Sequence, residues 1–277
     1  MCRLFGLTAG TNRVRATFWL LDAPDSVEVQ SRRNADGSGI GFFGPAGSPV
    51  LDKQPEPAFS DQEFTREATQ AESATFVAHV RLATVGGRTV ANTHPFAMNG
   101  RIMAHNGSFG ELRQIDEQLG PYRRLVLGDT DSERYFALIT QQVDAHGGDV
   151  AAGITAAAGW IAERLPVVAL NAIITTADEL WALRYPDQHA LHVLERPGQG
   201  GLHVRSATSS VRVPALEAAR SVVIASERLD GETGWRMLAP GELVHVRPDL
   251  SVESAVVLAG PPARLIPLSG HNPNIDT

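Results

Sequence analysis

The sequence predicts an α+β fold in one domain, with helices packed against sheets of short strands. Helix signals occur in residues 60–71, 130–143 and 150–165. After Pro166 the pattern changes to short apolar runs that are typical of strands, at residues 167–175, 179–185, 190–194, 202–206, 221–226, 242–246 and 251–255. Many short strands that follow a pair of helices indicate sheets and helices in separate layers.

The first half begins with a strand signal. Residues 3–9 form a short apolar run that predicts a buried strand, which places Cys2 at the mouth of a sheet. Residues 17–21 predict a helical or packed segment. Residues 39–43 alternate glycine with apolar residues, and glycine in a strand often marks the close approach of a backbone or a ligand.

Residues 75–83 predict a second strand, whose side chains alternate between its two faces. One face has Phe76, Ala78, Val80 and Leu82, and the other has Val77, His79 and Arg81. An arginine among apolar neighbours needs a partner. The glycine-rich residues 85–89 come next and predict a lid beside a candidate site.

Asn99-Gly100 lies between two apolar runs and predicts a hairpin turn. The second strand of this hairpin is expected to end at His105-Asn106-Gly107, and residues 108–119 are expected to be helical. The helix at residue 130 opens with a capping box, Thr130-Asp131-Ser132-Glu133. Asp131 then falls in the first turn, where the helix dipole favours a carboxylate.

Composition narrows the class of protein. The 277 residues are 43% hydrophobic, and a net charge of −7 disfavours sequence-independent binding to nucleic acid. No apolar run is long enough to span a membrane, and the first residues lack the pattern of a signal peptide. A single cysteine excludes an internal disulfide framework, and no metal-site spacing is present. The sequence therefore predicts a soluble cytoplasmic protein without a metal or cofactor, with one domain at residues 2–260 and a loose Pro/Asn-rich tail at 261–277.

Cys2 is the only cysteine. If Met1 is removed, this one residue has both a thiol and a free α-amine. An α-amine titrates at about 7.7–8.0, so part of it is neutral near neutral pH and is able to take the proton of the thiol. The alternative is that a cysteine at position 2 is accidental, and the rest of the chain decides between the two interpretations.

Three further features complement this nucleophile. Arg81 offers a planar fork for a carboxylate, and Asp131 offers a carboxylate for an ammonium group. Asn106 and Gly107 are able to present a side-chain amide and a backbone N–H to a developing oxyanion. A substrate with an α-carboxylate, an α-ammonium and a scissile amide carbonyl matches all of these groups. Glutamine, or another γ-glutamyl amide, is such a substrate.

Each residue also has a structural interpretation. Arg81 could form a structural ion pair, Asp131 could only start a helix, and Asn106-Gly107 could be a plain turn. For His79, His94 and His105, a structural role is the favoured interpretation.

Five segments together resemble the class II glutamine amidotransferases, which are N-terminal-nucleophile hydrolases with a four-layer αββα sandwich. They are Met1 to Gly6, His79 to Thr84, Asn92 to Phe96, Ala104 to Gly107 and Gly128 to Glu133. Residues 225–230, Trp235 and residues 240–243 extend the resemblance toward the C-terminus. The joint order of these motifs is highly specific, although each motif alone is weak.

The resemblance implies a role for each matching residue. Cys2 would be the nucleophile with its α-amine as base, and Asn106 and Gly107 would form the oxyanion hole. Arg81 would hold the substrate α-carboxylate and Asp131 its α-ammonium. Thr84 would contact substrate as part of the glutamine-covering loop, residues 84–88. The sequence departs from the glucosamine-synthase pattern at Leu82 and Val85, where tryptophan and histidine are common, which concerns the lid and not the chemistry.

The acceptor of the released amine stays open. Only about a hundred residues follow position 166, too few for a second synthase domain, so a stand-alone amidohydrolase is expected, with ammonia passing to water or to a partner synthase. One alternative is a dedicated γ-glutamyl conjugate hydrolase of the ergothioneine type. An alternative of another class is a catalytically silent subunit that binds glutamine or docks to a synthase.

Overall fold

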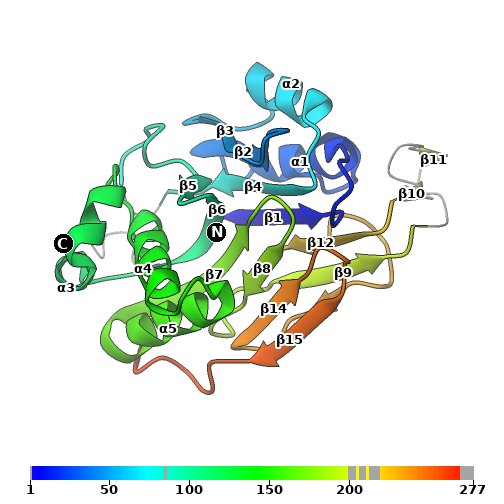
Figure 1. The fold of residues 1–277 in the computed structure, drawn as a ribbon. Helices are drawn as coiled ribbons and strands as arrows, with labels where there is room; N and C mark the ends of the chain where they lie inside the picture. Colours follow the sequence, from blue (N-terminus) through cyan, green and yellow to red (C-terminus); the bar gives the residue numbers. More distant parts are fainter. Residues whose placement is uncertain (1, 84–85, 199–203, 206–209, 212–218, 269–277) are drawn as a thin grey trace.

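The computed structural model describes residues 2–83, 86–198, 204–205, 210–211 and 219–268. Two extended sheets lie face to face, and helices cover the outer side of each sheet (Figure 1). The predicted α+β class and the four-layer αββα arrangement are therefore confirmed. No helix in these ranges is long and apolar enough to cross a bilayer.

The first sheet has the strand order β13-β9-β12-β1-β4-β2-β3. Its strands are β1 (Arg3–Thr8), β2 (Gly37–Phe43), β3 (Pro49–Gln54), β4 (Thr75–Arg81), β9 (His192–Arg196), β12 (Ser221–Ala225) and β13 (Arg236–Met237). Strand β1 lies in the middle and pairs antiparallel with both β4 and β12. Its central place fixes the position of Cys2, the residue just before it.

The second sheet has the order β15-β14-β8-β7-β6-β5, and β16 pairs in parallel with β7. Its strands are β5 (Phe96–Met98), β6 (Arg101–Phe109), β7 (Pro166–Thr175), β8 (Leu180–Leu183), β14 (Glu242–Val246), β15 (Val252–Val256) and β16 (Arg264–Leu265). Two further short strands, β10 (Val204–Arg205) and β11 (Ser210–Val211), pair antiparallel with each other. The other residues of the strand predicted at 202–206 lie outside the described ranges.

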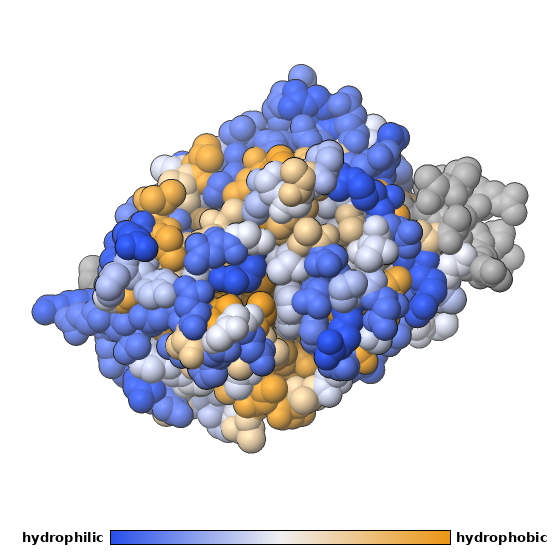
Figure 2. All heavy atoms as spheres, viewed as in Figure 1, coloured by the Kyte–Doolittle hydropathy of each residue, from blue (hydrophilic) through white to orange (hydrophobic). Residues whose placement is uncertain are grey.

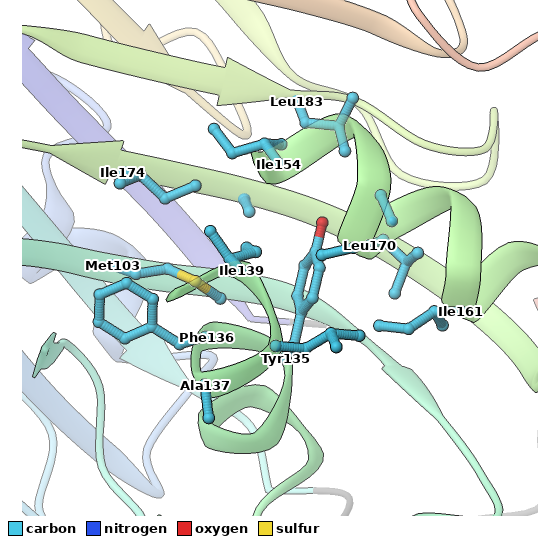
Figure 3. Close-up of a cluster of buried hydrophobic side chains, with 14 of the residues drawn as sticks. Met103, Tyr135, Phe136, Ala137, Ile139, Ile154, Ile161, Leu170, Ile174 and Leu183 are labelled. Carbon is cyan, nitrogen blue, oxygen red and sulfur yellow. The ribbon is translucent and has the colours of Figure 1, made fainter. Parts of the chain in front are cut away.

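Buried apolar side chains form one core between the sheets and one under each helical layer. The first sheet is covered by η1 (Phe18–Asp22), α1 (Val27–Ser31) and α2 (Gln62–Gln70). The second is covered by α3 (Leu112–Leu119), η2 (Gly120–Leu125), α4 (Asp131–Ala145) and α5 (Val150–Arg164). Figure 3 shows Tyr135 and Ile139 of α4 packed with Met103 and Leu170 of the sheet.

Helix α2 shows how the sequence sets an amphipathic outer layer. Only Phe64 and Ala68 are buried in it, and its other side gives the hydrophilic surface at the top of Figure 2. The cap lies one residue later than predicted, because Asp61 and not Ser60 accepts the N–H groups of Glu63 and Phe64. Serine and aspartate are about equally good N-cap residues, so propensity alone does not choose between these two neighbours.

The predicted hairpin at Asn99-Gly100 is present between β5 and β6. Both turn residues have positive φ, 46° and 74°, as a two-residue hairpin turn with the right twist requires.

The expected end of the second hairpin strand is wrong. Strand β6 continues through Asn106 and Gly107 to Phe109, and the helix starts only at Leu112. The reason is tertiary: Asn106 and Gly107 pair with Asn171 and Leu170 of β7, so they extend the sheet and do not turn.

The C-terminal segment is attached to the second sheet up to residue 268. Residues 264 and 265 form β16, the Ile266 N–H donates to the Val167 carbonyl at 2.8 Å, and the Leu268 N–H donates to Gln188 at 2.8 Å. This part of the predicted loose tail is thus held by backbone pairing. Residues 269–277 lie outside the described ranges.

Candidate active site

Cys2 lies at the start of β1, beside the end of β4. The Leu82 N–H donates to the Cys2 sulfur at 3.3 Å, and the thiol donates to the Leu82 carbonyl at 3.4 Å. This contact follows from the register of the pair, in which Arg3 lies opposite Val80. The sheet therefore fixes the sulfur at the edge where β4 ends and a loop begins.

Burial raises the pKa of the Cys2 thiol. The hydrogen bond from Leu82 and the positive charge of Arg81 act in the opposite direction, and Asp131 adds to the increase. A thiol with a raised pKa is a poor nucleophile at neutral pH unless a base takes its proton. The site thus has a nucleophilic atom that needs a base within reach.

Arg81 is buried on the face of β4 that lies toward the second sheet, as the alternation in the sequence predicts. Its Nη1 donates to the Gly87 carbonyl at 3.0 Å and its Nη2 to the Gly86 carbonyl at 3.1 Å. Burial lowers the pKa of the guanidinium, while the charges of Cys2, Asp36 and Asp131 raise it. Arg81 therefore fastens the glycine-rich loop to the site while its charge stays beside Cys2.

Asp36 holds the same loop from its other side, and the sequence did not single it out. Its carboxylate accepts the Ala83 N–H at 2.8 Å and forms an ion pair with Arg88. The residue directly precedes β2, whose Gly37 lies opposite Arg81 in the register. No local sequence signal indicates this contact, because the partners are 47 or more residues away along the chain.

Asn92 connects two loops at the rim. Its side-chain amide donates to the Gly87 carbonyl at 3.2 Å, and its side-chain oxygen accepts the Asp129 N–H at 2.8 Å. The loop before α4 is closed further by Glu133, which accepts the Gly128 N–H at 2.6 Å. The glycine-rich loop and the α4 N-terminus are therefore one connected unit.

Asp131 opens α4 and turns its carboxylate toward the end of β6. One oxygen accepts the Phe109 N–H at 3.1 Å, and the other accepts the Ser132 N–H at 2.8 Å. The predicted cap of this helix is confirmed, since the Thr130 hydroxyl accepts the Glu133 N–H at 3.2 Å. Thr130, and not Asp131, therefore caps the helix. The Asp131 residue is 4% exposed.

Asn106 and Gly107 are consecutive residues of β6 with opposite orientations. Asn106 shares a face with Ile102 and Ala104, which pack between the sheets, and is 3% exposed. A side chain at Gly107 would lie 1.8 Å from the Ala169 carbonyl oxygen, so only glycine allows β7 to approach this closely.

One pocket joins most of the predicted site. Its free space is small, about 20 Å³, which is room for about one water molecule. Its lining contains four predicted residues, Cys2, Arg81, Gly107 and Asp131, together with Leu82, His94, His105, Thr130 and Ser132. Asn106 adjoins Gly107 but is not among the lining residues, and Thr84 lies outside the described ranges.

The three histidines predicted to be structural are buried next to this pocket. The rings of His79 and His94 are in contact, with centroids 4.2 Å apart and planes tilted by 35°. Burial lowers the pKa of His79 to about 3, helped by the charge of Arg81, and lowers the pKa of His94 well below its ordinary value. His94 and His105 nonetheless line the pocket, which their sequence motifs alone did not indicate. No group of three metal-ligating side chains occurs within the part of the chain that the structure describes.

The pattern that describes "Glutamine amidotransferases class-II" matches residues 1–257. The chain belongs to this family. The match spans both sheets and every pocket residue, so it covers the whole fold that positions the site.

Two curated relatives illustrate the range of this amidotransferase family. The chain is 30% identical over 256 residues to the gamma-glutamyl-hercynylcysteine sulfoxide hydrolase of Mycobacterium tuberculosis, covering 89% of this chain and 93% of the relative. It is also 30% identical over 170 residues to the probable glutamine amidotransferase DUG3 of Saccharomyces cerevisiae, covering 54% of this chain but 47% of that protein.

Solved structures share the fold at low identity. The glutamine phosphoribosylpyrophosphate amidotransferase of B. subtilis aligns with a TM-score of 0.65 and 19% identity, over 94% of this amidotransferase chain and 50% of the other. A class-II glutamine aminotransferase domain protein of Silicibacter pomeroyi aligns with a TM-score of 0.60 and 20% identity, over 92% and 98% of the two chains.

Proposed function

We propose that the protein hydrolyses the γ-amide bond of glutamine or of a γ-glutamyl amide, with Cys2 as an N-terminal nucleophile. One observation supports this most strongly: the Cys2 sulfur, the Arg81 cation, the Gly107 backbone and the Asp131 carboxylate line a single pocket. The cation and the carboxylate match the α-carboxylate and the α-ammonium at one end of a γ-glutamyl amide, and the sulfur and the backbone match the amide carbonyl at its other end.

Removal of Met1 gives Cys2 a free α-amine, which takes the thiol proton as the sulfur attacks the γ-carbonyl carbon. This base is needed because burial raises the pKa of the thiol. The carbonyl oxygen becomes an oxyanion, which the Gly107 N–H and the Asn106 side-chain amide stabilise. The carbon–nitrogen bond then breaks, and the leaving amine takes the proton from the α-ammonium of Cys2.

Hydrolysis of the γ-glutamyl thioester completes the cycle. A water molecule gives one proton to the α-amine and adds its oxygen to the thioester carbon. The carbon–sulfur bond breaks, the thiolate regains a proton from the α-ammonium, and glutamate leaves. Arg81 holds the α-carboxylate and Asp131 the α-ammonium of the glutamyl group throughout, and Thr84 is part of the loop that covers it.

The runner-up is a hydrolase dedicated to a bulky γ-glutamyl conjugate. Two observations favour it: the mycobacterial sulfoxide hydrolase is similar over nearly its whole length, and Leu82 beside the sulfur is 38% exposed. An apolar side chain at the mouth of the pocket suits a leaving amine larger than ammonia. Alternatively, ammonia passes to a partner synthase, as 28% identity over 115 residues to a Bradyrhizobium diazoefficiens glutamine–fructose-6-phosphate aminotransferase loosely suggests.

The test measures glutamate release from L-glutamine and from a panel of γ-glutamyl amides and conjugates, using protein whose intact mass confirms loss of Met1. Release that disappears in Cys2→Ala, with the thermal melting temperature unchanged, supports the proposal. Activity that survives in Cys2→Ala contradicts the nucleophile assignment. Binding of glutamine without any turnover identifies the silent glutamine-binding subunit instead.

The profile of the panel separates the substrate classes. Fast release of glutamate from glutamine alone means that the protein serves as a source of ammonia. A preference for a conjugate with a bulky amine means the dedicated hydrolase.

A further inference from the structure

Next to Asp131 the pocket contains a hydrogen-bonded pair that the mechanism above does not use. The His105 Nδ1 lies 2.9 Å from the Ser132 hydroxyl oxygen, and the His105 Nε2 lies 3.1 Å from the Ala169 carbonyl oxygen. His105 is 1% exposed and Ser132 is 4% exposed. Both residues line the pocket that contains Cys2.

The partners of His105 determine its tautomer. A carbonyl oxygen only accepts hydrogen bonds, so the proton of the neutral ring is on Nε2 and Nδ1 is an acceptor. Burial lowers the pKa of His105, which keeps the ring neutral at neutral pH. The Ser132 hydroxyl must therefore donate its single proton to Nδ1.

This assignment leaves no proton for the neighbouring contact between the Ser132 hydroxyl and Asp131. The Ser132 hydroxyl oxygen is 3.3 Å from one carboxylate oxygen of Asp131, which already accepts the Ser132 N–H at 2.8 Å. With the hydroxyl proton directed to His105, both oxygens at this contact face each other as acceptors. Both oxygens still have lone pairs able to accept, and one group with several N–H donors is able to donate to both at once.

We infer that Ser132 is a second acceptor for the α-ammonium of the substrate beside Asp131, and that His105 is a positioning residue that directs the Ser132 hydroxyl proton away from that site. The inference deepens the proposed function and rests on it, because it takes the ligand to be an α-amino acid. It makes recognition of the ammonium depend on a neutral hydroxyl as well as on a charge.

The test measures binding of two ligands to Cys2→Ala protein, in which no turnover occurs. Isothermal titration compares L-glutamine with glutaramate, the same molecule without its α-ammonium. Adding Ser132→Ala should weaken glutamine binding and leave glutaramate binding unchanged. The expected loss of glutamine affinity is about 10-fold or more, which is the usual range for a hydrogen bond to a charged group. Ser132→Thr keeps the hydroxyl and should restore most of the glutamine affinity.

A second variant tests the role of His105. His105→Phe keeps an aromatic ring against Tyr135, whose centroid is 5.4 Å away, but removes the Nδ1 acceptor. The Ser132 hydroxyl then donates to Asp131, so glutamine binding should weaken while glutaramate binding does not. A melting curve of each variant confirms that it is folded.

Several results overturn the inference. Equal weakening of both ligands by Ser132→Ala means a purely structural role, and no change for either means no contact with the ammonium. Absence of glutamine binding to the Cys2→Ala protein also overturns it. One further result separates this inference from the proposed function. If the preference for glutamine depends on Ser132 but the protein with Cys2 intact releases no glutamate, the ammonium site is supported and the proposed hydrolysis is contradicted.

Discussion

At the scale of single residues, the site depends on side chains that combine two tasks. Arg81 has five N–H donors in a planar group, of which Nη1 and Nη2 hold the Gly87 and Gly86 carbonyls. The same cation lies beside Cys2 and is the proposed partner of the substrate α-carboxylate. A residue with this geometry is poorly replaced by another cation.

We expect Arg81→Lys to raise the KM for glutamine by about tenfold or more, with a smaller effect on kcat, because lysine keeps the charge but loses the planar fork. Steady-state glutamate release measures both constants. Arg88→Lys is the matched control, since this exposed arginine pairs with Asp36 at the outer side of the same loop. If the two lysine variants have the same KM, Arg81 does not bind the substrate.

At the scale of elements, the pairing of β6 with β7 shapes the pocket floor. At Gly107 the partner strand lies too close for any side chain, and this residue adjoins the Asn106 amide that is proposed to stabilise the oxyanion. Of these two consecutive residues, Gly107 lines the pocket and Asn106 adjoins it. The proposed oxyanion hole therefore depends on the pairing of β6 with β7 and not on an isolated Asn-Gly turn.

Gly107→Ala should destabilise the fold strongly, by about 3 kcal/mol or more, because its Cβ would clash with the Ala169 carbonyl of the partner backbone. Urea unfolding followed by circular dichroism measures the change. The comparison is Gly100→Ala, where φ is 74° and nothing lies within 4 Å of the added atom, so only the positive φ costs about 1 kcal/mol. Equal losses in both variants would refute the close approach of β7.

At the scale of the whole molecule, buried histidines next to the pocket connect stability to pH. His79 is fully buried between the sheets, with its pKa lowered to about 3, mainly by burial. An unfolded chain binds a proton at this residue near pH 6.5, but the folded chain does not until much lower pH. Acid therefore favours the unfolded state between those two values.

We expect the free energy of unfolding to fall as the pH drops below about 6.5, by about 1.4 kcal/mol per pH unit for each such histidine. Urea midpoints at pH 7.5 and 5.5 measure this loss. His79→Phe keeps the ring contact with His94 and removes one titrating group, so its loss should be smaller. The exposed His146→Gln is the control and should behave as the unsubstituted protein does; an unchanged slope in His79→Phe would contradict the prediction.

Most elements of the fold could be predicted from the sequence, because their signals are local. The alternation along β4 placed Arg81 on its correct face, and Thr130 gave the start of α4. The Asn99-Gly100 turn needs only its own two residues to adopt positive φ. The motif order also sufficed to indicate the family, whose pattern matches residues 1–257.

The sequence by itself predicted which residues would form the site, and four of them, Cys2, Arg81, Gly107 and Asp131, line one pocket. Only the tertiary structure decided how they are held. Asn106 is in a strand because β7 pairs with it, and His105 directs Ser132 because the Ala169 carbonyl, 64 positions away, fixes its tautomer. Such contacts join distant segments, and a pattern in one segment has no information about the donor or acceptor that another segment brings to it.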